Sequence, residues 1–177
     1  TSRILPAPRS FAALVLVPFA GTRRTFLVFA TALALVSLLG LSWRYAVAPV
    51  ACAALILLPV GTLKASGEGV VVWEGETDYQ YARVIQRPDG ERKLELNEGL
   101  AVHSVYRPGT WLTGNYWDEF LVLPFARGRG SSSIAILGNA AGTTARAYGH
   151  FFPRDRVDGV EIDGELSDIG RRYFDLS

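Results

Sequence analysis

The chain has 177 residues, of which 49% are hydrophobic and 20% charged, with a formal net charge of +1. This composition excludes a disordered chain and a collagen-like repeat, and the single cysteine, Cys52, excludes an internal disulfide. The charge is uneven: residues 1–63 hold five Arg and no Asp, Glu or Lys, whereas residues 64–177 hold 13 basic and 17 acidic side chains. We therefore expect a folded domain with an appendage that lies in different surroundings.

Two uncharged runs, residues 25–43 and 45–63, are each 19 residues long. A helix of that length crosses the roughly 30 Å hydrocarbon layer of a bilayer. Both runs are predicted to be transmembrane helices; the alternative, two buried helices of a soluble core, is disfavoured because neither has a polar face. A shorter apolar run, residues 10–22, is predicted as a third span.

Basic residues flank these runs and predict their orientation. Arg23 and Arg24 lie in one short loop, Arg44 lies alone in the next, and Lys64 follows the last span. The positive-inside rule then places the first loop and everything after Lys64 in the cytoplasm. Residues 1–64 are therefore predicted to be a transmembrane region of two or three helices, and the chain an integral membrane protein with a cytoplasmic soluble domain.

From residue 69 onward the pattern becomes that of extended strands. Four runs alternate in polarity between turn residues such as those of Pro88-Asp89-Gly90. In one of them Leu94 and Leu96 can face a core while the neighbouring charges face water. A small antiparallel β domain is predicted over residues 65–126, and a linking helix over residues 111–124 that ends at a proline.

Residues 127–177 alternate between strand and helix. We call residues 138–143 (GNAAGT) the glycine turn. The predicted elements are, in order, a strand at 134–137, the glycine turn, a helix at about 144–151, a strand at 157–163 and a helix at 165–174. This order is that of the first half of a doubly wound parallel sheet, and the remaining strands are expected beyond Ser177.

The glycine turn and an acid after the second strand predict a ligand. Gly138 allows a sharp bend and the close approach of a ligand, and the following helix offers unpaired N–H groups. Glu161, 23 residues after Gly138, can accept hydrogen bonds from both hydroxyls of a ribose. Nucleotide or nucleoside binding is predicted. The alternatives are that the glycines only allow close helix packing and that Glu161 is an ordinary solvated acid; Asp163 is predicted to cap the helix that follows it.

Other classes of site are not indicated. His103 and His150 lack partner ligands at metal spacing, so no metal site is predicted. The acidic excess of residues 64–177 argues against nucleic-acid binding. Three aromatic residues are predicted to be core or interface residues: Trp111, Tyr116 and Trp117.

With these features the sequence resembles the spermidine synthase, or polyamine aminopropyltransferase, family, in particular its bacterial members that carry membrane spans ahead of the catalytic domain. Five segments carry the resemblance. Residues 76–81 (ETDYQY) are similar to the family's E-x-x-Y-Q hairpin, residues 96–99 (LNEG) to its L-x-D-G turn and residues 116–118 (YWD) to its Y-H-E. Residues 136–143 are similar to its glycine-rich loop, and residues 160–163 (VEID) to its V-E-I-D strand end.

The resemblance implies a small β domain followed by a Rossmann-like methyltransferase fold. It also implies transfer of an aminopropyl group from decarboxylated S-adenosylmethionine, a co-substrate rather than a tightly bound cofactor, to a diamine such as putrescine. The family's catalytic aspartate is expected beyond residue 177. The implied nucleoside-binding residues are Gln80, Gly138, Gly142 and Glu161, and the implied amine-channel residues are Tyr79, Tyr116 and Asp118.

Two departures from the family pattern concern the amine. Ala141 stands where the family has a loop carboxylate, and Trp117 where it has a histidine. Anchors for a cationic diamine are then missing, although Asp118 and Glu98 supply nearby carboxylates. The alternatives are a non-catalytic, membrane-tethered nucleoside-binding module and an S-adenosylmethionine-dependent methyltransferase. A homodimer and the identity of the acceptor amine stay open.

Overall fold

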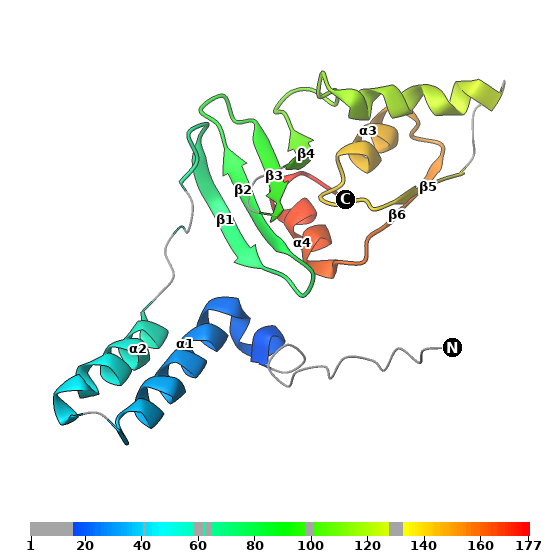
Figure 1. Ribbon diagram of the computed structural model, residues 1–177. Coiled ribbons are helices and arrows are strands. Elements are labelled where there is room, and N and C mark those ends of the chain that lie inside the picture. Colours follow the sequence, from blue (N-terminus) through cyan, green and yellow to red (C-terminus); the bar gives the residue numbers. More distant parts are fainter. Residues whose placement is uncertain (1–15, 41, 59–61, 63–64, 98–100, 128–132) are drawn as a thin grey trace, which may run out of the picture. The chain divides into compact units, whose positions relative to one another are not determined.

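The structure is a computed structural model that describes residues 16–40, 42–58, 62, 65–97, 101–127 and 133–177 (Figure 1). The chain divides into two compact units, residues 1–61 and residues 62–177. The division falls close to residue 64, where the predicted transmembrane region ends.

The first unit is a helical hairpin. Helix α1 (Val17–Ser37) packs against α2 (Val47–Leu57), which follows the 3₁₀ turn η2 (Trp43–Ala46). Gly21, with φ 76°, interrupts the helical backbone near the start of α1. Soon after this break, the Arg23 guanidinium donates to the carbonyl oxygens of Leu55 (3.1 Å) and Leu58 (3.3 Å). A cation therefore caps α2 where the last carbonyls have no partner within their own helix.

The hairpin supports the membrane prediction only in part. Among the described residues one helix, Phe19–Ser37, is long and apolar enough to cross a bilayer. It begins six residues before the predicted span at 25–43, so Arg23 and Arg24 lie inside the helix and not in a loop. This placement corrects the prediction.

Within the described residues, the helix at the predicted span 45–63 is also shorter than expected, and residues 59–61 and 63 of that span lie outside the described part. Helix α2 has 11 residues, or about 17 Å, and ends at Leu57; the backbone of the next residue, Leu58, is extended. The residue before a proline disfavours the helical conformation, and Pro59 follows Leu58. Of the predicted third span at 10–22, residues 10–15 lie outside the described part, and residues 17–22 belong to α1.

The second unit begins with the predicted antiparallel sheet. Its strands β1 (Val70–Glu76), β2 (Tyr81–Gln86), β3 (Arg92–Leu96) and β4 (Ala101–Tyr106) pair in sequence order. Leu94 and Leu96 are buried as predicted. Glu95 corrects the prediction that the charges between them face water, because it is buried and its carboxylate binds the buried Arg83 guanidinium at 2.6 Å.

The second part of this unit has the predicted alternation of strand and helix. Strand β5 (Ser133–Leu137), helix α3 (Thr143–Phe151), strand β6 (Arg156–Val160) and helix α4 (Gly164–Tyr173) follow one another, and β5 pairs with β6 in parallel. Leu166, Ile169 and Phe174 share one core with the inward side chains of β2 and β3. Helix α4 therefore lies against the antiparallel sheet and joins the two parts (Figure 1).

The linking helix differs from its predicted bounds. The 3₁₀ helix η4 spans Tyr116–Arg127 and contains Pro124, so it begins later than residue 111 and does not end at the proline. It begins later because Asp118 organises the loop in front of it: the carboxylate accepts the N–H groups of Thr113 (2.9 Å) and Gly114 (2.7 Å).

Candidate functional site

The parallel pairing of β5 with β6 brings the glycine turn next to the end of β6. Leu137 at the end of β5 pairs with Val160 at the end of β6. Gly138 follows β5 directly, and Glu161 follows β6 directly. The N–H groups of Gly138 and Asn139 donate to the Val160 carbonyl oxygen at 2.9 and 3.2 Å. The two predicted nucleoside contacts therefore lie at one edge of the sheet.

Glu161 is fixed in place by two backbone donors. Its Oε2 atom accepts the N–H of Ala140 at 2.7 Å, and its Oε1 atom accepts the N–H of Asp163 at 3.0 Å. A carboxylate oxygen has two lone pairs, so each oxygen can accept one further hydrogen bond. The side chain is partly buried, and its bond to Ala140 holds it beside the glycine turn.

The two glycines predicted to shape the turn have different surroundings. Both have positive φ angles, 77° for Gly138 and 86° for Gly142. A Cβ atom on Gly138 would have nothing within 4 Å, whereas one on Gly142 would lie 2.5 Å from Leu176 Cδ1. Gly138 therefore leaves open space that a ligand can occupy, and Gly142 allows close packing at the start of α3.

Asp163 joins the end of β6 to the antiparallel sheet. It caps α4 as predicted, because its Oδ1 atom accepts the Glu165 N–H at 3.2 Å. Its Oδ2 atom accepts the Thr77 hydroxyl at 2.6 Å and the Gln80 amide at 3.4 Å. Gln80, on the turn between β1 and β2, thus lies beside the strand end that carries Glu161.

The charge around this strand end is negative. Burial raises the pKa of Glu165, and the nearby Asp163, Asp78 and Asp168 carboxylates raise it further. Residues 161–168 together with the β1–β2 turn therefore present several carboxylates, which is favourable for a cationic ligand.

A cavity of about 410 Å³ opens beside the glycine turn on the side of η4. Gly138 and Tyr116 line it, and the Tyr116 ring stacks on Trp117 with ring centroids 4.3 Å apart. Trp117 is 9% exposed and belongs to the buried hydrophobic residues, as predicted. The other lining residues include His103, Ser104, Phe120, Leu123, Asn139 and Ala140.

The three predicted amine-channel residues do not gather around this cavity. Tyr116 lines it, but Tyr79 is 58% exposed on the β1–β2 turn and is not a lining residue. Asp118 uses its carboxylate for Thr113 and Gly114, as described above, and is not a lining residue either. The amine channel therefore stays a prediction.

Ala141, at the position of the family's loop carboxylate, has no exposed surface. Its N–H donates to the Ser104 Oγ atom of β4 at 3.0 Å. Beside it, the Thr143 hydroxyl bonds both the N–H (2.8 Å) and the carbonyl oxygen (3.1 Å) of Val105. This position therefore holds the glycine turn against β4.

Sequence reasoning missed these links to the antiparallel sheet. Thr77 lies 86 positions from Asp163 and Ser104 lies 37 positions from Ala141. The one sign in the sequence was that Thr77 stands within the quoted hairpin motif ETDYQY.

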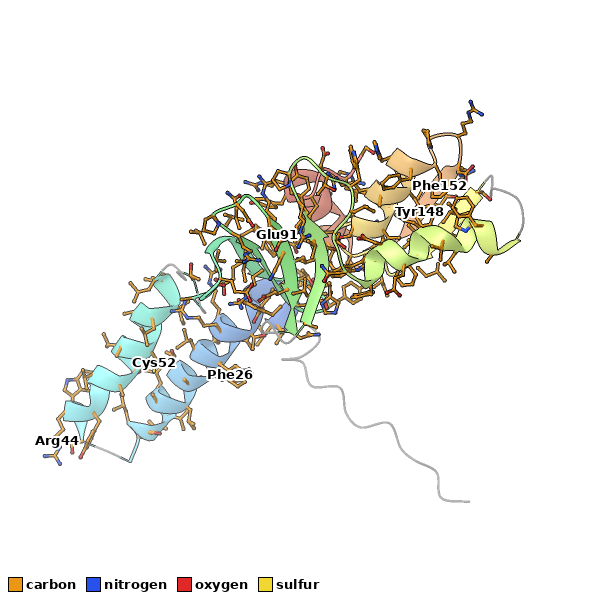
Figure 2. The ribbon with its side chains drawn as sticks, turned by 90° about the horizontal axis from the view of Figure 1, so that it is seen from above. Phe26, Arg44, Cys52, Glu91, Tyr148 and Phe152 are labelled. Atoms are coloured by element: carbon orange, nitrogen blue, oxygen red, sulfur yellow. The ribbon has the colours of Figure 1, made fainter. Side chains whose placement is uncertain are left out.

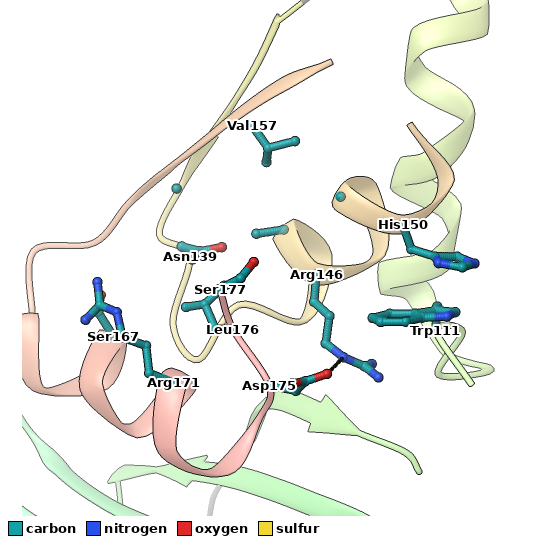
Figure 3. A pocket seen from close by; sticks show the side chains of 13 residues that line it. Trp111, Asn139, Arg146, His150, Val157, Ser167, Arg171, Asp175, Leu176 and Ser177 are labelled. Atoms are coloured by element: carbon teal, nitrogen blue, oxygen red, sulfur yellow. Dashed lines mark ion pairs between the residues drawn. The ribbon is translucent and has the colours of Figure 1, made fainter. Parts of the chain in front are cut away.

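A second cavity, of about 520 Å³, lies between α3 and α4, and none of the predicted site residues lines it (Figure 3). The Arg146 guanidinium lies between the Tyr106 ring (4.6 Å) and the Trp111 ring (4.2 Å), and His150 stacks on Trp111 at 4.4 Å. The dashed line in Figure 3 joins Arg146 to Asp175 at 3.7 Å. This stack ties α3 to the loop before η4.

A strand, a glycine turn, a helix and a parallel strand that ends at an acid form an arrangement typical of nucleotide-binding α/β proteins. No family model matches the chain. The chain is 36% identical over 105 residues to the "Probable polyamine aminopropyl transferase" of Bifidobacterium longum, a match that covers 59% of this chain and 23% of that protein. The resemblance to the spermidine synthase family is therefore confirmed.

The chain spans about a quarter of the length of that curated relative. Among solved structures it is similar to a probable spermidine synthase from Corynebacterium glutamicum, with a TM-score of 0.48 and 20% sequence identity. That match covers 61% of this chain and 41% of the solved chain.

Proposed function

We propose that the chain is the nucleoside-binding part of an aminopropyltransferase that transfers an aminopropyl group from decarboxylated S-adenosylmethionine to a diamine such as putrescine. The observation that carries the proposal is the Glu161 carboxylate, which two backbone N–H groups fix beside the glycine turn. The family-level similarity to a polyamine aminopropyl transferase supports the same substrate class.

Glu161 is suited to hold a ribose. Its two oxygens each keep one lone pair, and the 2′- and 3′-hydroxyls of a ribose can donate to them side by side. Charge-assisted hydrogen bonds of this kind are stronger than neutral ones. The open space at Gly138 then lets the rest of the nucleoside pass close to the backbone.

In the proposed reaction a neutral amine nitrogen attacks the carbon bonded to the sulfonium. The new C–N bond forms as the C–S bond breaks, methylthioadenosine leaves, and a base takes the proton that the amine loses. We assign donor binding to Gln80, Gly138, Gly142 and Glu161, and assign the base to none of the residues described here.

We further propose that the helical hairpin anchors the chain in a lipid bilayer with the second unit in the cytoplasm. The hairpin exposes large apolar side chains that water would solvate poorly, and Phe26 points away from it (Figure 2). The most exposed of them are Phe19, Phe26, Leu33, Leu39, Trp43, Val47 and Leu57.

A binding measurement tests the nucleoside site. Methylthioadenosine binding to the 177-residue chain is measured by calorimetry for the wild type, for Glu161→Gln and for the control Glu119→Gln, an exposed acid on η4. Glu161→Gln should weaken binding at least tenfold, because an amide accepts from one atom only. Equal affinity of wild type and Glu161→Gln would refute the assignment of Glu161.

A second candidate is a non-catalytic module that binds the nucleoside at the membrane. It is favoured by Trp117, a buried core residue at the position where the family has a histidine. Turnover separates the two candidates: a full-length protein that binds methylthioadenosine but forms none from decarboxylated S-adenosylmethionine and putrescine would be such a module. Stronger binding of S-adenosylmethionine than of its decarboxylated form would instead indicate a methyltransferase.

A further inference from the structure

The contact between Thr77 and Asp163 connects the two nucleoside-binding segments that the proposed function uses. Thr77 begins the β1–β2 turn, residues 77–80, which carries Gln80. Asp163 lies two residues after Glu161 and is 2% exposed. The Thr77 hydroxyl and the Asp163 Oδ2 atom are 2.6 Å apart.

The Thr77 hydroxyl uses its complete hydrogen-bonding capacity. It accepts the N–H groups of Tyr79 and Gln80, both at 3.1 Å, so it holds the turn in shape. A hydroxyl has one proton to donate, and two acceptors lie within reach, the Asp163 Oδ2 atom at 2.6 Å and the Gln80 carbonyl oxygen at 3.1 Å. The shorter contact, to a carboxylate, directs the proton to Asp163. The conformation of the turn and its attachment to β6 therefore depend on one oxygen atom.

Asp163 has a corresponding role at the end of β6. Its Oδ2 atom accepts from Thr77 and Gln80, its Oδ1 atom accepts from the first turn of α4, and its own N–H donates to Glu161. Glu161 in turn accepts from Ala140. An unbroken series of hydrogen bonds thus runs from the β1–β2 turn through Asp163 and Glu161 to the glycine turn.

We propose that Thr77 and Asp163 are positioning residues for the nucleoside site: their contact sets the distance between the Gln80 amide and the Glu161 carboxylate. The inference rests on the proposed function, because it presumes that both segments contact the nucleoside. It goes beyond that function because neither residue needs to touch the ligand. Without this contact, the β1–β2 turn would have to be ordered by the ligand on binding, and the cost of that ordering would lower the affinity.

The test compares methylthioadenosine affinity and thermal stability in variants of the 177-residue chain. Thr77→Val keeps the shape of the side chain and removes the hydroxyl, and it should weaken binding about tenfold. Thr77→Ser keeps the hydroxyl and should restore affinity to within about twofold. Thr110→Val is the matched control, because the Thr110 hydroxyl also serves a turn, that of Leu112, and should leave affinity unchanged.

Asp163→Asn separates positioning from helix capping. The amide oxygen can still cap α4, but the amide nitrogen faces two donors, the Thr77 hydroxyl and the Gln80 amide. We expect about a tenfold loss of affinity. The double variant should lose less than the sum of the two single losses, because both single variants remove the contact between Thr77 and Asp163.

Three outcomes overturn the inference. They are unchanged affinity in Thr77→Val, failure of Thr77→Ser to restore it, and additive losses in the double variant. The first of these outcomes is the one expected of a purely structural contact, which would lower the melting temperature without changing the affinity measured well below it. Absence of methylthioadenosine binding to the wild type would instead refute the proposed function on which it rests.

Discussion

The buried ion pair between Arg83 and Glu95 provides a quantitative test of the energetics of the antiparallel sheet. The two residues face each other on β2 and β3, and their side chains are 7% and 11% exposed. Both Nε (2.8 Å) and Nη2 (2.6 Å) of Arg83 donate to the same oxygen of Glu95. Two charges about 4 Å apart interact by about 4 kcal/mol at an effective dielectric constant of about 20.

Glu95→Gln keeps the shape of the side chain and removes the opposite charge from a buried guanidinium. Breaking a buried pair in this way costs about 3–5 kcal/mol of the free energy of unfolding, because the remaining charge is still desolvated. Asp168→Asn is the matched control, since Asp168 pairs with Arg171 at 2.8 Å but the two side chains are 77% and 63% exposed. Loss of that pair should cost no more than about 0.5 kcal/mol.

Urea unfolding followed by tryptophan fluorescence measures both variants on the 177-residue chain. With a denaturant slope of about 2 kcal/mol per M, a loss of 3 kcal/mol lowers the unfolding midpoint by about 1.5 M. Replacing both members of the buried pair by leucine should recover most of the loss, because neither buried charge of the pair is then left without its partner. Equal midpoint shifts for Glu95→Gln and Asp168→Asn would refute the reasoning.

Two further predictions concern pH and the glycine turn. Burial acts against ionisation of Glu91, but hydrogen bonds from Arg107 and Arg87 outweigh it and lower the pKa of Glu91. The stabilisation by the ionised Glu91 carboxylate is therefore present above the unfolded pKa of 4.5 and is lost as the pH falls through the folded pKa. The difference in the free energy of unfolding between wild type and Glu91→Gln should then shrink on acid titration and not grow. Gly138→Ala should lower the free energy of unfolding by about 1 kcal/mol, because residue 138 has a positive φ. It should also weaken methylthioadenosine binding severalfold, because the added methyl group would occupy the open space beside the turn. Unchanged affinity by calorimetry would mean that the ligand does not approach this glycine.

The periodic part of the sequence predicts most of the second unit. Alternation at Leu94 and Leu96 identifies a strand with a buried face, and the order of strands and helices after residue 133 identifies the parallel pair. Glu95 escapes the alternation rule because its partner Arg83 lies on another strand, and hydropathy gives no sign of a partner. The start of η4 differs from the prediction for a similar reason, since the side-chain contacts of Asp118 set where that helix begins.

The site is predictable where it depends on strand register and not where it depends on packing between the two parts of the second unit. Contacts such as Thr77 with Asp163 arise because α4 lies against the antiparallel sheet, and no local pattern records that arrangement. The departure at Ala141 shows the same limit. The sequence shows a methyl group in place of a carboxylate, but the bond to Ser104 that holds this position appears only in the fold.

The spacing between Gly138 and Glu161 follows directly from the register of β5 and β6. Every pair in that register, from Ser133 with Arg156 to Leu137 with Val160, is separated by 23 positions, which is also the separation of Gly138 and Glu161. Because the strands are parallel, the residues that follow their last pair must leave the sheet at the same edge. An insertion within α3 or its flanking loops would change the spacing in the sequence without separating these residues, provided that the register is kept. The register of the two strands, and not a fixed number of residues, is therefore what brings the glycine turn to the carboxylate.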